Sequence, residues 1–212
     1  MADFSLEKKL ADKYKFIAGV DEAGRGPLAG PVVAATVILD HRDDIFSEIN
    51  DSKKLSKIKR EKLFELIISN AIDYSVYFVD NSTIDEINIL RATMLAMSGA
   101  IKNMKLKADF LLIDGNYFKP DDEIIKKIPA TTIIKGDSDS KSIAAASILA
   151  KVTRDRWMET VAHQEFPQYN FSKHKGYATK EHIELIKKHG VCKYHRRSFL
   201  KNILRPSNNL FE

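Results

Sequence analysis

Cysteine and long apolar segments are scarce in this sequence. A single cysteine, Cys192, cannot form an internal disulfide, which excludes a disulfide-stapled fold and favours a reducing compartment. The first residues lack the apolar core of a signal peptide, and the longest apolar run, residues 32–39, is much shorter than the ~18 residues of a membrane span. We therefore expect a cytoplasmic protein without membrane contact.

Internal repeats, low-complexity tracts and Ser/Gly-rich linkers are also absent from the 212 residues. With 44% hydrophobic and 30% charged residues, the chain is long enough for one globular domain with a small extension. The net charge of +5 is unevenly distributed, since residues 171–205 carry +8 and the remainder carries −3. This basic segment indicates a polyanionic partner such as a phosphate backbone. A solvated helix face is the alternative.

Short runs rich in β-branched and aromatic residues predict five strands, and helical spacing of apolar residues predicts four helices between and after them. The strands are expected at residues 15–21, 31–39, 72–79, 109–114 and 130–134, and the helices at 56–70, 82–105, 140–166 and 179–189. Two adjacent strands followed by alternating helices and strands predict an α/β fold, with a mixed sheet and helices on both faces.

The helix predicted at residues 140–166 has one nearly bare side. Small residues form this side: Ala144, Ala145, Ala146, Ser147 and Ala150. They indicate tight packing on the sheet. Lys151 and Arg154 on the same helix are interpreted as ordinary surface charges.

Acidic residues follow several of the predicted strands. Asp21 and Glu22 follow the apolar stretch that ends at Val20, Asp114 ends another strand, and Asp137 precedes the long helix. Acids at the ends of buried strands project into the crevice above a sheet. Several carboxylates in one cleft must be protonated or hold cations, and hard divalent ions prefer such oxygen ligands. The pattern therefore favours two-metal phosphoryl chemistry over solvated loop acids.

The segment Gly24-Arg25-Gly26-Pro27-Leu28-Ala29 also matches the loose dinucleotide-binding pattern G-x-G-x-x-G/A. However, the acidic pair before it would repel a pyrophosphate, and Pro27 removes a backbone donor. We favour close approach of this backbone to a sugar, with Arg25 available for a phosphate.

A zinc site is an alternative role for the C-terminal histidines. His189, Cys192 and His195 are three residues apart, and His174 or His182 could complete a set. The paired spacing typical of zinc ligands is missing, so this alternative is disfavoured.

Ordered blocks along nearly the whole chain resemble bacterial ribonuclease HII. They are IAGVDEAGRGPLAGPVV at residues 17–33, NDSKKL at 50–55, DEINIL at 85–90, IDGN at 113–116, KGDS at 135–138, SIAAASILAKV at 142–152, HKGYAT at 174–179 and HRRSF at 195–199. The related HIII branch is disfavoured because it lacks the GRG loop and carries an added N-terminal domain. Leu200-Lys201 stands where the HII family often has a proline, and Asp139 adds an acid beside Asp137.

The resemblance implies a ribonuclease H-like mixed five-stranded sheet flanked by helices, with residues 1–170 as the catalytic domain. Residues 171–212 would be a basic C-terminal helical extension packed on the same domain. It also implies two divalent ions, magnesium or manganese, and a set of site residues. These are Asp21, Glu22, Asp114 and Asp137 as metal-binding catalytic carboxylates; Gly24, Arg25 and Gly26 at the ribose 2′-hydroxyl; Tyr177 against the sugar on the 3′ side; and Lys53, Asn88 and Lys175 near the backbone.

The implied activity is hydrolysis of the phosphodiester 5′ of ribonucleotides, in RNA–DNA hybrids and at single ribonucleotides in duplex DNA. It would leave 3′-hydroxyl and 5′-phosphate ends and serve ribonucleotide excision in replication and repair. A dinucleotide-dependent oxidoreductase and a non-catalytic nucleic-acid-binding protein are the competing classes. We expect a monomer. The tail at residues 207–211 weakly resembles a sliding-clamp-binding peptide, and a disordered terminus is the preferred interpretation.

Overall fold

The structure, a computed structural model, describes residues 2–204 apart from the side chain of Lys54. Its centre is a five-stranded sheet in the order β3-β2-β1-β4-β5. The strands are β1 (Ile17–Ala23), β2 (Val32–Ile38), β3 (Asp73–Val79), β4 (Phe110–Asp114) and β5 (Ala130–Ile133). β2 is antiparallel to β1 and β3, whereas β1, β4 and β5 run parallel. The predicted mixed α/β sheet is confirmed.

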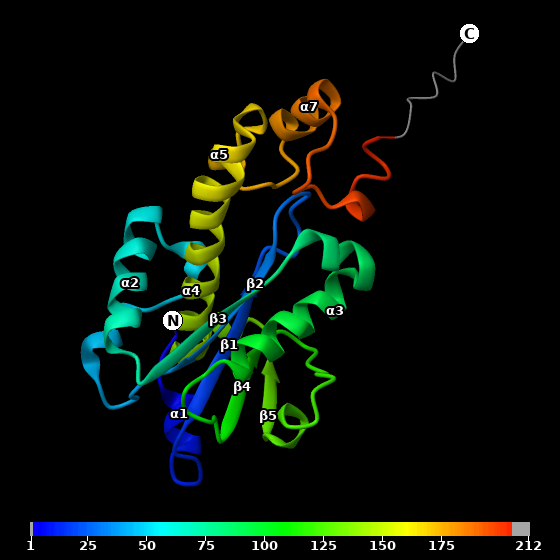
Figure 1. The fold of residues 1–212 in the computed structure, drawn as a ribbon. Helices are drawn as coiled ribbons and strands as arrows, with labels where there is room; N and C mark the ends of the chain where they lie inside the picture. The colour runs from blue at the N-terminus through cyan, green and yellow to red at the C-terminus, as the bar shows by residue number, and fades with distance from the viewer. Residues whose placement is uncertain (1, 205–212) are drawn as a thin grey trace.

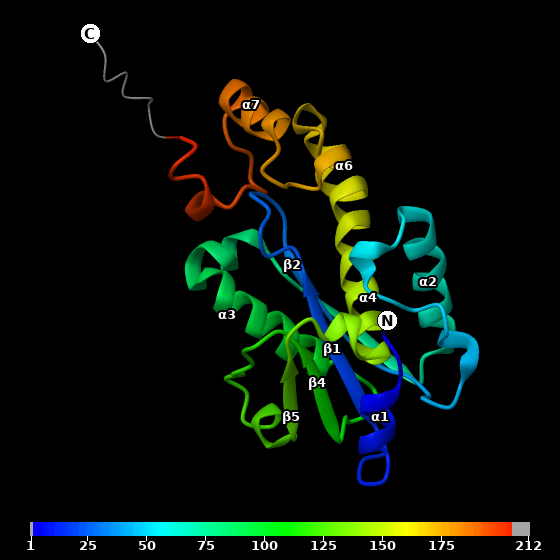
Figure 2. The same ribbon diagram turned by 180° about the vertical axis from the view of Figure 1, so that it is seen from behind.

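Helices cover both faces of this sheet (Figures 1 and 2). α3 (Asn81–Lys102) covers one face, and α1 (Ser5–Leu10), α2 (Lys57–Asn70) and α4 (Lys141–Trp157) cover the other. Alternation along β2 serves both faces, because Val32 and Ala34 join the cluster beneath α3 while Ala35 and Val37 join the cluster beneath α4. Two apolar layers therefore enclose the sheet.

α4 lies very close to β1. A Cβ at Gly19 would be 2.1 Å from the carbonyl carbon of Ser142, so only glycine permits this approach. The Ser140 side chain caps the helix by accepting from the Ile143 N–H at 3.2 Å. The predicted helix at residues 140–166 is divided, because α4 is followed by a π-helix at Met158–Ala162 and by α5 (His163–Glu165).

The C-terminal segment forms its own apolar cluster around the end of α4. It includes α6 (Phe171–His174) and α7 (Lys180–His189), and its core contains Phe171, Ile186 and Leu200 together with Leu28 from the loop between β1 and β2. Both ribbon views show that loop reaching the C-terminal segment. The division at residue 170 stays a prediction. Within residues 2–204, no helix combines the length and apolarity that crossing a bilayer would need.

Candidate active site

The predicted carboxylates meet at one edge of the sheet. Asp21 and Glu22 lie near the end of β1, and Asp114 is the last residue of β4. Because β1 and β4 are parallel neighbours, their C-terminal ends lie at the same edge. Asp137 approaches from the 3-10 turn Gly136–Ser138, between β5 and α4. Four acids from three chain segments therefore gather at this edge.

Burial and mutual repulsion disfavour the ionised state of Asp21, Glu22 and Asp114. Asp21 is 4% exposed, and its burial, followed by the charges of Glu22 and Asp114, raises its pKa well above the usual value. Burial likewise raises the pKa of Glu22, and the pKa of Asp114 is raised by burial and then by the Asp137 charge. A cation bound among them would relieve this repulsion.

The donor set fits a hard divalent ion. Asp114 Oδ1 is buried without a hydrogen-bond partner among the described residues, while Glu22 pairs with Arg25 at 3.3 Å and Asp137 with Lys53 at 3.1 Å. Within residues 2–204, no three His, Cys, Asp or Glu side chains are placed to hold a metal ion by themselves. Magnesium commonly takes only some of its oxygen ligands from protein and the rest from water and phosphate. The carboxylates therefore suit an ion whose coordination the substrate completes.

A cleft of about 300 Å³ opens beside the carboxylates. Its lining comes from the end of β1, the loop that follows it, the 3-10 helix Ser52–Lys54, α2, β4, α4 and the segment before α7. The lining residues are Asp21, Glu22, Ala23, Gly24, Arg25, Gly26, Ser52, Lys53, Arg60, Asp114, Ser147, Lys151 and Tyr177. The cleft thus combines acidic, basic and aromatic groups in one place.

The loop between β1 and β2 presents its backbone to this cleft. Gly24 has φ +93°, and the Arg196 guanidinium donates hydrogen bonds to Gly24 O at 2.6 Å and to Arg25 O at 2.9 Å. In a planar trans peptide the N–H points opposite to the carbonyl, so the N–H groups of Arg25 and Gly26 point away from Arg196. A Cβ at Gly26 would meet nothing within 4 Å, which leaves space for a ligand.

Comparison with known proteins identifies the family. The family model described as ribonuclease HII matches residues 18–202. A curated ribonuclease HII from Caldicellulosiruptor saccharolyticus is 57% identical over 203 residues, which cover 95% of this chain and 96% of the relative. The chain belongs to the ribonuclease HII family. The predicted resemblance is confirmed, and family membership makes the chain a ribonuclease H, an endonuclease acting on RNA–DNA hybrids.

Solved structures of the ribonuclease HII type share the fold. The ribonuclease H2 of Pyrococcus horikoshii OT3 matches with a TM-score of 0.68 and 31% identity, over 89% of this chain and 96% of that one. A ribonuclease HII of Archaeoglobus fulgidus, solved in complex with PCNA, matches with a TM-score of 0.66 and 30% identity, over 82% and 87% of the two chains. The five-stranded sheet and its helices are therefore those of ribonuclease H enzymes.

Two residues expected near the substrate backbone in a ribonuclease HII lie outside the cleft lining. Asn88 has φ 66° within α3 and its Oδ1 accepts from the N–H groups of Leu90 and Arg91, so it caps the helical segment after a kink. Lys175 turns toward Glu159 at 2.9 Å, and its side chain is only 14% exposed. By contrast, Lys53 and Tyr177 both line the cleft.

The geometry separates Asp137 from its acidic neighbour. Asp137 is 2% exposed and bonds Lys53 at the carboxylate edge. Asp139 is exposed and lines a different cavity, beside α1 and β5. The structure thus places Asp137, and not Asp139, beside the other three predicted carboxylates.

The dinucleotide and zinc alternatives both lack their structural context. The Gly24 loop leads into β2, antiparallel to β1, rather than into the helix N-terminus that a dinucleotide fingerprint requires. His195 uses both ring nitrogens, one accepting from the Cys192 N–H and one bonded to His182 Nε2 at 3.1 Å. In the described part of the chain no metal-binding histidine and cysteine group occurs.

The interpretation of Arg154 as a surface charge is wrong. Arg154 is fully buried, and its guanidinium bonds three carbonyl oxygens. Lys151 is half-buried at the cleft. Helical spacing could have identified both, because Ser147, Lys151 and Arg154 follow one another at intervals of four and three residues and therefore share a face of α4.

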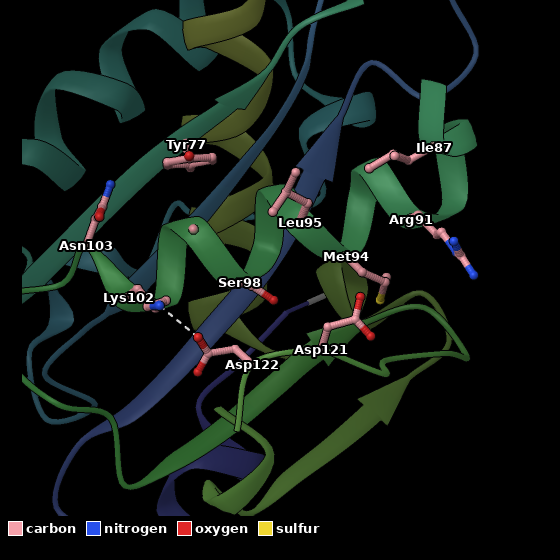
Figure 3. A pocket seen from close by; sticks show the side chains of 11 residues that line it. Tyr77, Ile87, Arg91, Met94, Leu95, Ser98, Lys102, Asn103, Asp121 and Asp122 are labelled. Atoms are coloured by element: carbon pink, nitrogen blue, oxygen red, sulfur yellow. Dashed lines mark hydrogen bonds and ion pairs between the residues drawn. The ribbon is translucent and has the colours of Figure 1, made fainter. Parts of the chain in front are cut away.

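A larger cavity of about 620 Å³ lies away from the ribonuclease HII carboxylates. Figure 3 shows side chains of α3, including Met94 and Ser98, beside Asp121 and Asp122 of the loop that follows β4, with the Lys102–Asp122 ion pair at one end. The larger of these two cavities is therefore not the one that the predicted catalytic carboxylates line.

Proposed function

We propose that this enzyme hydrolyses the phosphodiester on the 5′ side of a ribonucleotide, both in RNA–DNA hybrids and at a single ribonucleotide in duplex DNA. The products would carry 3′-hydroxyl and 5′-phosphate ends. The observation that carries the proposal is the cleft in which Asp21, Glu22 and Asp114 lie beside the Gly24-Arg25-Gly26 loop and Tyr177. One cleft thus offers ligands for metal ions and groups that can read a sugar.

Asp21, Glu22, Asp114 and Asp137 would hold two divalent ions, magnesium or manganese. When bound, such ions activate a water molecule and stabilise the leaving oxygen in phosphoryl transfer. The chain supplies carboxylates whose repulsion favours cation binding, and Ser147 orients Asp21 by a hydrogen bond that opposes the rise in its pKa. Ser52 in turn bonds Ser147 at 2.8 Å, which fixes that hydroxyl.

Recognition of the ribose would come from two elements. The outward N–H groups of Arg25 and Gly26 are suited to bond a 2′-hydroxyl at close range, since Gly26 carries no side chain. Tyr177 is 40% exposed, so its ring can lie against the next sugar, where a bare 2′ carbon fits and a second hydroxyl is crowded. Together they would select a ribonucleotide followed by a deoxyribonucleotide.

The basic C-terminal segment would position the duplex through its phosphates. Lys53 lies in the cleft and is 78% exposed at its side chain, so it would meet the backbone near the carboxylates. Asn88 and Lys175 would meet the duplex only outside the cleft. Specificity then rests on the sugar contacts, because phosphate contacts carry no sequence information.

The deciding experiment uses an end-labelled DNA duplex containing one ribonucleotide, with and without magnesium. We expect cleavage 5′ of the ribonucleotide only with the metal, at an end that a DNA polymerase can extend. Asp21→Asn should abolish cleavage while hybrid binding persists, and Asp139→Asn is the matched control that should retain activity. Cleavage without metal, or an active Asp21→Asn protein, would overturn the two-metal mechanism.

Contact with a sliding clamp is a separate proposal about a partner. The Archaeoglobus fulgidus ribonuclease HII was solved with PCNA, and the clamp-like peptide of this chain at residues 207–211 lies outside the described residues. Deleting the chain after Pro206 should abolish clamp binding and leave hybrid cleavage unchanged. Equal clamp binding by the truncated protein would remove the proposal.

A further inference from the structure

Arg154 lies beneath the two segments that the proposed function assigns to sugar recognition. It projects from α4, and its guanidinium donates from Nε to Pro31 O at 2.9 Å and from Nη2 to Ala29 O at 3.0 Å. The same guanidinium donates from Nη1 to Lys175 O at 3.1 Å. One side chain therefore joins the loop between β1 and β2 to the segment that carries Tyr177.

Arg154 also contacts the recognition residues themselves. A Cβ at Gly24 would be 2.1 Å from Arg154 Nε, so this glycine rests directly on the guanidinium. On its other side, Arg154 Cζ is 5.8 Å from the centroid of the Tyr177 ring, within the range of a cation–π contact. Arg154 thus contacts both the Gly24-Arg25-Gly26 loop and the Tyr177 ring.

Backbone contacts also join the loop between β1 and β2 directly to the segment that carries Tyr177. The Leu28 N–H donates to Gly176 O at 2.8 Å. Gly176 has φ +82°, and a Cβ there would be 2.6 Å from Ala29 O. The backbones therefore touch, and the guanidinium bonds both segments next to this contact, at Ala29 O and Lys175 O.

The burial of Arg154 is costly, which indicates a specific role. The side chain is fully buried, and burial lowers its pKa. Its three hydrogen bonds go to backbone carbonyl oxygens rather than to a carboxylate. A planar guanidinium can hold three carbonyls in fixed directions, whereas a lysine ammonium at the same place cannot reproduce that fork.

We propose that Arg154 is a positioning residue that fixes the Tyr177 ring relative to the Gly24-Arg25-Gly26 loop, and so sets the preference for a single ribonucleotide over continuous RNA. This inference rests on the proposed function. A ribonucleotide junction is read by both elements at once, so their separation matters. Within a continuous hybrid the next sugar keeps its hydroxyl, and the position of the ring matters less.

The test compares kcat/KM on a duplex with one ribonucleotide and on a continuous RNA–DNA hybrid. Arg154→Lys keeps the charge and removes the fork, and should lower the ratio of the two values about tenfold, the effect expected from losing one or two net hydrogen bonds. In a Tyr177→Ala background the same substitution should leave the ratio unchanged. Ile186→Ala, in the apolar cluster of the C-terminal segment and on α7, is the control for a general loss of stability.

The outcomes separate the inference from the function on which it rests. If the wild-type protein fails to cleave the single-ribonucleotide duplex, the proposed function is wrong. If the wild-type protein cleaves both substrates and Arg154→Lys lowers both kcat/KM values equally, Arg154 is only structural. The same conclusion holds if Arg154→Lys changes the ratio of the two values no more than Ile186→Ala does at the same loss of Tm. A tenfold change of ratio that persists in the Tyr177→Ala background would also overturn the assigned link.

A second measurement applies if Arg154→Lys does not fold. In the wild-type protein, the Arg154 Nε–H donates to Pro31 O and should give a protected NMR signal. Without divalent metal, that signal should shift more when the single-ribonucleotide duplex binds than when an all-DNA duplex of the same sequence binds. Equal shifts would overturn the inference.

Discussion

Buried titratable side chains gather in two regions of the molecule, and the two regions differ in how many of these side chains have hydrogen-bond partners. At the sheet edge, Asp21, Glu22 and Asp114 have raised pKa values, and Asp114 Oδ1 has no hydrogen-bond partner among the described residues. In the C-terminal segment, the rings of His174 and His182 stack at 4.3 Å and those of His182 and His195 at 5.3 Å, and every ring nitrogen of these three histidines is paired.

The histidine contacts define one arrangement of protons. The Cys192 N–H donates to His195 Nδ1, so neutral His195 carries its proton on Nε2 and donates it to His182 Nε2. His182 then carries its proton on Nδ1 and donates it to Tyr177 O at 2.9 Å. A buried network with every group paired stabilises the fold, whereas buried acids with groups left over are typical of a ligand site.

The sharpest way to break this comparison is to neutralise an acid. Asp114→Asn should lower kcat on hybrids by at least about 10³-fold, because metal-borne charge stabilisation contributes several kcal/mol. Its Tm should stay the same or rise, since a repelled buried charge is removed. Single-turnover assays and thermal denaturation measure the two effects. A lower Tm would assign Asp114 to the fold.

Removing a histidine should have the opposite signature. His195→Ala leaves a cavity and unpairs the Cys192 N–H and a ring nitrogen of His182, and should cost about 2–4 kcal/mol of unfolding free energy. Turnover on hybrids should persist at temperatures where the variant is folded. Urea denaturation measures the loss, and an unchanged midpoint would show that the network is not stabilising.

The histidines and the acids should also affect the free energy of unfolding in opposite directions as pH changes. Burial lowers the pKa of His182 and His195 to about 4, below their ordinary 6.5, so the unfolded chain binds more protons between these values. Their stabilisation is complete above pH 6.5 and is lost as pH falls toward 4, by about 1.4 kcal/mol per pH unit for each histidine. The acids act oppositely, because raised folded pKa values make their contribution decline as pH rises.

Denaturation midpoints measured from pH 4 to 6.5 test this opposition. His195→Ala should flatten the pH dependence of stability, and Asp114→Asn should steepen it. Parallel curves for the wild-type protein and both variants would contradict the assigned directions.

The smallest effect is expected from exposed lysines, through their contribution to duplex affinity. Lys187 and Lys188 are exposed at the end of α7. Neutralising both to Gln should reduce the slope of log affinity against log salt by about 0.9 for each phosphate that these lysines neutralise in the wild-type protein. The same change at exposed Lys8 and Lys9 of α1 is the control. An unchanged slope would make the α7 lysines a solvated helix face.

The fold was largely predictable because its strands are apolar, β-branched runs. All five were predicted within two residues at either end. α1 was missed because its six residues carry little apolar pattern, and it is held by tertiary bonds from Ser140 Oγ and the Ser142 N–H to buried Glu7. Such bonds between distant residues leave no periodic signal in the sequence.

The residues of the candidate site likewise divide into those that the sequence could predict and those that it could not. Asp21, Glu22 and Asp114 could be placed together because strand ends bring acids to one edge. Helical spacing could place Arg154 on the face of α4 that carries Ser147 and Lys151. Its carbonyl partners, like those of Arg196, lie in the turn between β1 and β2 and could not be predicted. Only the folded turn reveals how many carbonyls point at them, and a sequence gives their charge but not that environment.

The connections of β1 divide the site into a local and a distant half. The loop that carries Gly24, Arg25 and Gly26 is the short link of the antiparallel pair of β1 and β2, which forms from neighbouring residues. Asp114 and Asp137 reach β1 only through parallel pairing of β4 and β5 after long crossings of the chain. Local pairs form early and distant ones late. The β1–β2 pair can therefore form before the carboxylates assemble, but the loop between these strands takes its bonds from Arg154 and Arg196, which follow β4 in the chain. A nascent chain that ends before β4 thus lacks both Asp114 and the two arginines that hold this loop.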